Sequence, residues 1–347
     1  MKLLFLPLML GFTLLSAQKV DLDPYNFGFS YRDLPHSVTD STLKTYAVKV
    51  DISGRMEEYM TADVISSKLA IQGREKVYRS PKIRWEFQVE DLVLEKFEIK
   101  EKVTSTTNKD KTVTKTTTYW VQLTYNISGK SRLLDANGLA LSRELDLFNG
   151  RSFVWDSKEF SYRSDASSFY YANRASLMSK MVREKMDYAI GYANRWANEQ
   201  AGFPEMSTRM YLWLVDNKNH PEYEPMSQRW NALKPALEGI YPDELRAEDS
   251  SKIAQMILYF DGLKTKYSKD EKADRKIRYA AWYNNAVLYM ILDQPEKAIE
   301  QTVGLISNDF DTKDGETLQK QANQLQDLFR RNSVYTRHFP LNEIPYR

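Results

Sequence analysis

The chain has 347 residues, and its 49 Lys and Arg nearly balance its 47 Asp and Glu, which leaves a net charge of +2. This balance excludes the domain-scale basic excess that is typical of nucleic-acid-binding proteins. The absence of Cys excludes disulfides, thiolate metal ligands and cysteine nucleophiles, and three His leave little material for imidazole sites. Hydrophobic residues make up 42% of the chain, enough for a sizeable core, and the length predicts about two domains.

Residues 1–17 have the pattern of a signal peptide. Lys2 precedes an apolar run from Leu3 to Leu15, and the small residues Ser16 and Ala17 follow it. The run is shorter than the roughly 20 residues that a membrane-spanning helix needs. We therefore predict cleavage after Ala17 and export to the periplasm, the outer membrane or the cell surface, with no transmembrane segment in the mature chain.

Residues 18–44 are predicted to form an extended arm. Aromatic side chains recur there at every second position, which is typical of a strand with one apolar face: Tyr25, Phe27, Phe29 and Tyr31. Two interpretations stay open. The aromatic face packs on the chain's own sheet, or it binds a partner protein by strand addition, and these four residues are then partner-binding candidates.

Residues 45–164 are predicted to form a β-rich domain. Alternating apolar residues indicate strands near 46–52, 83–89 and 92–99, with a helix over about 57–72. Residues 102–120 are rich in Thr and Lys around an Asn-Lys-Asp turn, which predicts a long hairpin whose tip projects into solvent. The hairpin is either plainly solvated or a contact arm for a partner or an anionic surface.

Residues 165–332 change to a helical period and are predicted to form an all-α domain of antiparallel helix pairs, followed by an extended tail at 333–347. The sequence as a whole therefore predicts an α+β protein. The expected helices span about 165–199, 205–216, 224–239, 243–267, 274–292, 296–307 and 315–331.

The segment from Ala280 to Ile306 resembles a tetratricopeptide (TPR) repeat. Trp282 and Tyr289 occupy the repeat's aromatic positions, and Ala286 and Ala298 its small positions, where two helices cross closely. The match covers about one repeat of some 34 residues. The pattern departs at Asn285, where Leu is usual, and at Thr302, where an aromatic residue is usual.

The TPR resemblance implies a scaffold for protein–protein contact, with Tyr283, Val287 and Met290 facing the bound peptide. The signal exit, the absence of Cys and the β-then-helix order are similar to uncharacterised exported envelope proteins of Gram-negative Bacteroidota. We therefore predict a non-enzymatic scaffold or subunit of an outer-membrane or periplasmic assembly. Its expected partners are other envelope proteins and not nucleic acid, and peripheral association with a membrane stays open.

The sequence contains no Gly-rich phosphate loop, no H-E-x-x-H and no G-x-S-x-G. Asp309 to Gly315 resembles the start of a calcium loop, but Lys320 occupies the position of the loop's last acidic ligand. We therefore expect no metal and no cofactor. Two alternatives remain: the many aromatic residues bind a carbohydrate or another surface ligand, or pairs of Asp and Glu serve a hydrolase.

Overall fold

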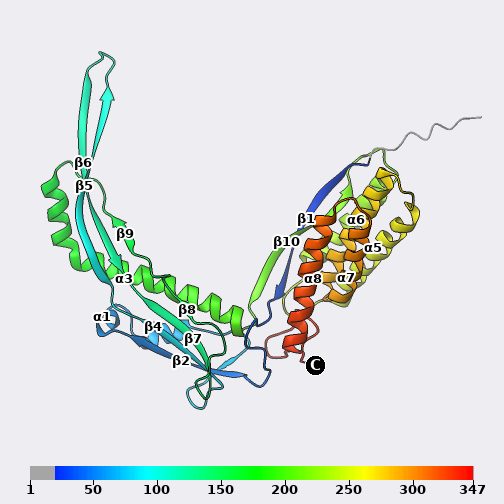
Figure 1. Ribbon diagram of the computed structural model, residues 1–347, viewed down its shortest axis with the longest axis horizontal. Coiled ribbons are helices and arrows are strands. Elements are labelled where there is room, and N and C mark those ends of the chain that lie inside the picture. The colour runs from blue at the N-terminus through cyan, green and yellow to red at the C-terminus, as the bar shows by residue number, and fades with distance from the viewer. Residues whose placement is uncertain (1–19, 347) are drawn as a thin grey trace, which may run out of the picture. The chain divides into compact units, whose positions relative to one another are not determined.

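The computed structural model describes residues 20–346, so the predicted signal peptide lies outside the described residues. The protein is α+β (Figure 1). It folds into two compact units, which we describe separately. The β-rich unit is Asp33–Pro204, and the helical unit combines the described residues up to Arg32 with those from Glu205 onward.

This division differs from the predicted boundary near residue 165. Helix α3 (Arg163–Ala201) belongs to the β-rich unit and not to the helical domain, because its apolar side chains share a core with the strands. Met181 and Met186 of α3 are buried in the same cluster as Trp85 and Phe87. The predicted arm does not stand apart either, because its strand joins the helical unit.

The β-rich unit contains two sheets. The first has the strand order β3-β2-β4-β7-β8, and the second the order β5-β6-β9. Their bounds are Thr45–Ile52 (β2), Glu75–Lys76 (β3), Ile83–Val89 (β4), Val93–Thr107 (β5), Val113–Asn126 (β6), Gly129–Asp135 (β7), Leu145–Asp146 (β8) and Phe153–Asp156 (β9). Strand β4 is central in its sheet, which explains why its alternating apolar side chains are buried completely.

The helix predicted over 57–72 is present only as two short pieces, α1 (Gly54–Glu57) and α2 (Ala62–Lys68). Thr61 lies between them in an extended conformation and caps α2, because its side chain accepts a hydrogen bond from the N–H of Val64. This cap sets the start of the second piece and separates it from the first.

The predicted long hairpin is present. Strands β5 and β6 pair antiparallel from their bases to the turn between Thr107 and Val113, and the hairpin extends beyond the rest of its unit (Figure 1). Residues 101–116 are all exposed. The distal half of the hairpin therefore buries no side chain in its own unit.

The helical unit consists of a two-stranded ribbon packed on helices α4 to α8 (Figure 1). The ribbon pairs β1 (Leu22–Arg32) antiparallel with β10 (Glu205–Val215). The helices are α4 (Tyr223–Glu238), α5 (Ala247–Lys266), α6 (Lys272–Ile291), α7 (Pro295–Ser307) and α8 (Thr312–Asn332). The helix predicted over 205–216 is wrong, because pairing with β1 holds this segment extended.

Neighbouring helices of this unit pack closely. A Cβ added to Gly304 of α7 would come within 2.7 Å of the Trp282 ring on α6, so this crossing requires glycine. Ala298 of α7 and Ala286 of α6 are fully buried. Small side chains therefore allow the approach of the two helices. Within residues 20–346, no helix combines the length and the hydropathy that a membrane span requires.

Candidate functional site

The ribbon's aromatic face packs on the helices of the same chain. Phe27 and Phe29 are buried, and the rings of Tyr25 and Phe27 contact Trp230 of α4 at centroid distances of 5.7 and 6.1 Å. The first interpretation of the arm therefore holds for these side chains. They form core and do not present themselves to a partner.

The main chain of the ribbon, in contrast, has a defined inner and outer edge. In antiparallel pairs, residues facing each other alternate between hydrogen-bonded and non-bonded pairs. Pro24, which has no N–H, faces Trp213, and both main-chain groups of Trp213 instead bond the side chain of Asn284. The N–H of Val215, two residues on, also turns outward, to the sulfur of Met226. The pairs that contain Trp213 and Val215, and every second pair from them along the ribbon, are therefore the non-hydrogen-bonded ones.

The same parity turns the N–H and C=O groups of Arg209 and Tyr211 away from β1, toward the outer edge of β10. No described residue forms a hydrogen bond with these main-chain groups. Asn284 ends this open stretch by satisfying Trp213. The ribbon therefore presents a short, unpaired strand edge, which is a template for another extended chain.

A groove runs along this open edge, and we call it the β10 groove. It consists of two adjoining hollows of about 340 and 270 Å³. Phe29, Tyr31, Thr208, Arg209, Met210, Met290, Gln321, Leu325 and Arg337 line the first hollow. Arg209, Met210, Tyr211, Tyr283, Asp314, Thr317, Leu318 and Gln321 line the second hollow.

The two hollows flank the same stretch of the strand. Thr208 lines only the first hollow and Tyr211 only the second, whereas Arg209 and Met210, whose side chains have opposite parity, line both. A chain added to the edge of β10 would direct its side chains alternately to the two faces of the ribbon, beside these hollows. This is the arrangement by which strand addition gains side-chain specificity.

The second hollow has a wall of aromatic rings with a carboxylate beside them. Tyr211 stacks on Tyr283 with ring centroids 5.4 Å apart, and the hydroxyl of Tyr279 donates to Asp314 at 2.5 Å. Burial, followed by these neighbours, raises the pKa of both Tyr279 and Tyr283 above the ordinary range. The hollow therefore offers the phenol rings of Tyr211 and Tyr283 and the carboxylate of Asp314, which already accepts from Tyr279.

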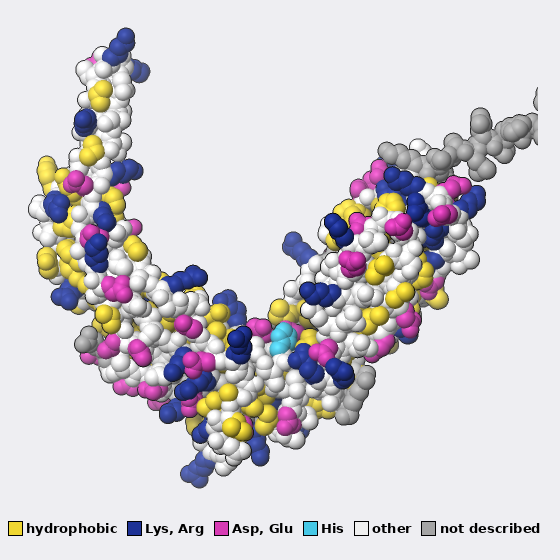
Figure 2. Space-filling view, in the orientation of Figure 1, with side chains coloured by type: hydrophobic (Ala, Val, Ile, Leu, Met, Phe, Trp, Pro, Cys, Tyr) yellow, Lys and Arg dark blue, Asp and Glu magenta, His cyan; other side chains and the backbone are white. Residues whose placement is uncertain are grey.

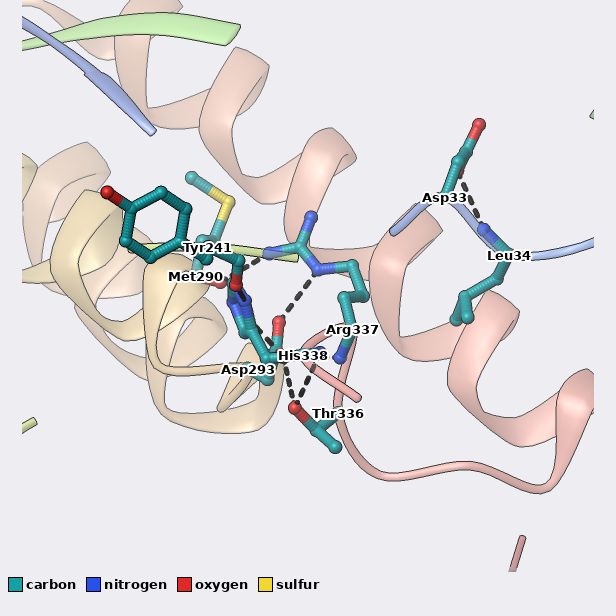
Figure 3. Close-up of polar contacts among 8 residues, drawn as sticks. All are labelled: Asp33, Leu34, Tyr241, Met290, Asp293, Thr336, Arg337 and His338. Carbon is teal, nitrogen blue, oxygen red and sulfur yellow. Dashed lines mark hydrogen bonds and ion pairs between the residues drawn. The ribbon is translucent and has the colours of Figure 1, made fainter. Parts of the chain in front are cut away.

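Arg337 closes the first hollow, and a buried carboxylate holds it in place (Figure 3). Its Nε donates to Oδ1 of Asp293 at 2.7 Å, its main-chain N–H donates to Oδ2 at 2.6 Å, and its Nη2 donates to the carbonyl of Met290 at 2.8 Å. The guanidinium also lies 4.5 Å from the centroid of the Tyr31 ring. The tail predicted to be extended instead folds back on itself, with a bridge between Val334 and Tyr346, and it supplies a fixed cation to the end of the β10 groove.

Figure 3 shows Thr336 and His338 at the same carboxylate. The hydroxyl of Thr336 donates to Asp293 at 2.9 Å, and Nδ1 of His338 lies 3.0 Å from the carbonyl of Tyr241. Burial lowers the pKa of His338, which favours the neutral form of its ring. A carboxylate, a histidine and a hydroxyl together suggest acid–base chemistry, but this chain's own donors occupy both oxygens of Asp293. The arrangement is a clamp on the tail.

The structure brings some predicted site residues together and separates others. Phe29, Tyr31 and Met290 line the first hollow and Tyr283 the second, so the two predicted sets meet in one groove. Their placement differs from the prediction, because Tyr283 and Met290 are only 7% exposed. They form part of the groove's walls, whereas the groups without hydrogen-bond partners in the described part of the chain belong to the main chain of β10. Val287, Tyr25 and Phe27 do not line the groove, and Val287 is fully buried.

Sequence reasoning missed the residues that define the groove's chemistry: Arg209, Tyr211, Asn284, Asp293 and Arg337. Alternating Met, Thr, Met, Leu and Leu at 206–214 is the signal that would have indicated a strand there. A second signal is the Asn pair at 284–285 within the apolar second half of its helix, since buried amides need specific partners.

Carbohydrate binding would need exposed aromatic rings, and a hydrolase would need paired carboxylates. Trp85 is buried, and Trp120 is half-buried, with its indole N–H donating to Asp156 at 3.1 Å. Over residues 20–346, no three His, Asp or Glu side chains come together in a way that would hold a metal ion.

No family model matches the chain, and no curated protein matches it. Among solved structures, a minor lipoprotein from Acinetobacter baumannii is similar at 11% sequence identity and a TM-score of 0.19. The similarity covers 47% of this chain and 96% of that chain. A TM-score this low supports no conclusion about fold or function.

Proposed function

We propose that the protein is a non-enzymatic, exported scaffold of the cell envelope that binds an extended segment of a partner protein by strand addition to β10. The observation that carries the binding mode is the outward main chain of Arg209 and Tyr211, which has no partner among the described residues and lies along a groove. Export and the envelope rest on the signal-peptide pattern of residues 1–17.

Two features support strand addition over other modes of contact. The hollows extend along the strand from Thr208 to Tyr211, so they give room for several side chains of an added strand. The outward N–H and C=O of Trp213 on this same edge are both bonded by the side chain of Asn284, so main-chain groups of this orientation are reached by a partner outside the ribbon. The TPR resemblance implies that a peptide contacts α6. In this chain, strand β10 itself contacts part of that helix.

The test uses the chain from Gln18 to Arg347 and a random peptide library. Peptides selected on the wild-type protein are resynthesised with single N-methyl groups at successive positions. Strand addition predicts that methylation weakens binding at every second position only, because alternate N–H groups point toward β10. Weakening at no position, or at adjacent positions alike, would contradict the proposal.

A matched pair of variants separates the main chain from the side chain. Arg209→Pro removes an outward N–H that makes no bond in the free protein, whereas Arg209→Ala keeps it. We expect Arg209→Pro to lose most peptide binding while the melting temperature stays near that of Arg209→Ala. Equal binding by the two variants would show that the edge is not used.

A further inference from the structure

The distal half of the β5–β6 hairpin, Lys102–Thr118, is the most exposed part of the β-rich unit, and we call it the basic arm. It carries Lys102, Lys109, Lys111 and Lys115 against the single acidic residue Asp110. Ion pairs occur only nearer the base of the hairpin, where Lys96 and Lys100 contact Glu98 at 2.9 and 3.0 Å. Lys and Arg side chains also gather at the free end of the hairpin in Figure 2.

The arm remains a ribbon without a core. Thr104 faces Thr116 and Thr106 faces Thr114, and such pairs of β-branched residues favour the extended state. At the turn, Asp110 accepts from the N–H and the hydroxyl of Thr112 at 3.1 and 2.6 Å. Its only carboxylate is therefore engaged in the turn, while the lysines face solvent.

The composition of the arm restricts the kind of ligand it fits. Residues 102–118 include no aromatic side chain and no Arg, so the arm offers neither a stacking platform for bases or sugars nor a bidentate donor. Lysine ammonium groups on a ribbon that is exposed on both faces suit a surface of distributed negative charge, because binding to such a surface does not require shape complementarity.

One face of the arm adds apolar contact to this charge. Val103 and Val113 are 57% and 59% exposed, and the strand register places them on the same face as Lys115. Two valines beside lysines fit an interface that is charged at its surface and apolar just beneath. Clusters of four to eight basic residues, beside a spanning helix or on an amphipathic helix, are typical of binding to acidic lipids, and the four lysines of the arm equal the lower end of that range.

We infer that the basic arm docks on the anionic headgroups of a lipid surface, with the face of Val103 and Val113 turned toward the lipid. This site lies in the β-rich unit and is independent of the β10 groove, so either proposal can fail alone. The arm would attach the protein to a membrane peripherally, without a spanning helix.

The experiment is co-sedimentation of the chain from Gln18 to Arg347 with large vesicles, either of pure phosphatidylcholine or with 30 mol% phosphatidylglycerol (a composition of about one acidic lipid in three). We expect binding only to the acidic vesicles, with loss in high salt because exposed charges are screened. Changing Lys102, Lys109, Lys111 and Lys115 to Gln should lower the partition coefficient about 600-fold, since each lysine near the surface contributes about five-fold.

A control variant removes the same charge elsewhere, by Gln at the exposed Lys44, Lys49, Lys82 and Lys218. We expect this variant to keep at least a third of wild-type binding. Val113→Thr tests the apolar face without changing charge and should weaken binding a few-fold. Equal loss in both quadruple variants, equal binding to both vesicle types, or tighter binding to single-stranded DNA than to acidic vesicles would overturn the inference.

Discussion

The side-chain amide of Asn284 forms two hydrogen bonds with the main chain of Trp213, each 2.8 Å long. Its oxygen accepts from the N–H and its nitrogen donates to the C=O, so a helix recognises one residue of an extended strand. This pair fixes β10 on α6 and ends the open part of the strand edge. The residues before Trp213 on the same edge have no such partner among the described residues, and this difference defines the β10 groove.

Asn284→Ala should destabilise the helical unit by about 2–3 kcal/mol, because it leaves the N–H and C=O of Trp213 without partners in a water-poor site. The matched control is Asn194→Ala, where an amide makes the same type of bridge to the main chain of Ala70 and Lys68 at a more exposed position. We expect the control to cost less than about 1 kcal/mol. Urea denaturation measures both, and equal losses would contradict the role given to burial.

Gly304→Ala should destabilise the protein by about 1–3 kcal/mol, because its Cβ would collide with the Trp282 ring. Gly262→Ala in α5 is the control, since a Cβ there meets no atom within 4 Å. It should stabilise the protein by up to about 1 kcal/mol through helix propensity. A neutral Gly304→Ala variant would show that the α6–α7 crossing is looser than described.

Asp293→Ala should cost about 3 kcal/mol and release the tail, because it removes the acceptor for Thr336 and Arg337. Asp293 also has a φ of 56°, a left-handed conformation that Asn tolerates better than Ala, so Asp293→Asn should fall between Ala and wild type.

Asp309→Ala is the control for the tail clamp, since Asp309 has a φ of 50° but an exposed carboxylate 3.8 Å from Arg275. This variant measures the cost of placing Ala at a positive φ while the Asp293 carboxylate still holds the tail. Hydrogen exchange of residues 333–346 should accelerate in Asp293→Ala and remain unchanged in Asp309→Ala. Acceleration in both would show that the turn, and not the carboxylate, holds the tail.

The helical unit should lose stability as the pH falls from about 7 toward 5.5. Burial lowers the pKa of both His220 and His338 in the folded protein, so below the ordinary histidine pKa of about 6.5 the unfolded chain binds more protons. The groups that face them are Glu222 and Lys266 at His220, and Asp293 and Arg337 at His338.

The measurement for this pH effect is the urea midpoint at several pH values, for the wild type and for a variant with Gln at both His220 and His338. The double variant is expected to be less stable but to show a flatter profile over this range. A wild-type midpoint that rises as the pH falls would contradict the buried, neutral assignment.

The helices α4 to α8 could be predicted from sequence because each carries its apolar residues at helical spacing, and Gly239 and Pro295 mark the end of α4 and the start of α7. Strand β10 was missed despite the alternation at 206–214, because a short apolar run fits either period and the pairing with β1, about 180 positions earlier in the chain, gives no local signal. The long hairpin was predictable, since Thr-rich strands and an Asn-Lys-Asp turn are local signals.

The groove itself is a tertiary feature. Its first hollow combines Tyr31, Met210 and Arg337, which no local pattern connects. Which N–H groups of β10 face outward depends on the register with β1, and a shift of one residue would reverse the set. The aromatic alternation in the arm correctly indicated a strand, but it identified the buried face, whereas the open groups belong to the main chain of the other strand.

The most direct test of the account is amide hydrogen exchange along β10, measured by NMR on the free protein and on its complex with a library-selected peptide. In the free protein, Arg209 and Tyr211 should exchange fast, while Met210 and Leu212, which point to β1, and Trp213, which bonds Asn284, exchange slowly. Peptide binding should slow exchange at Arg209 and Tyr211 and leave Trp213 unchanged. Slow exchange at Arg209 and Tyr211 in the free protein, or no change on binding, would contradict an open strand edge that receives a partner.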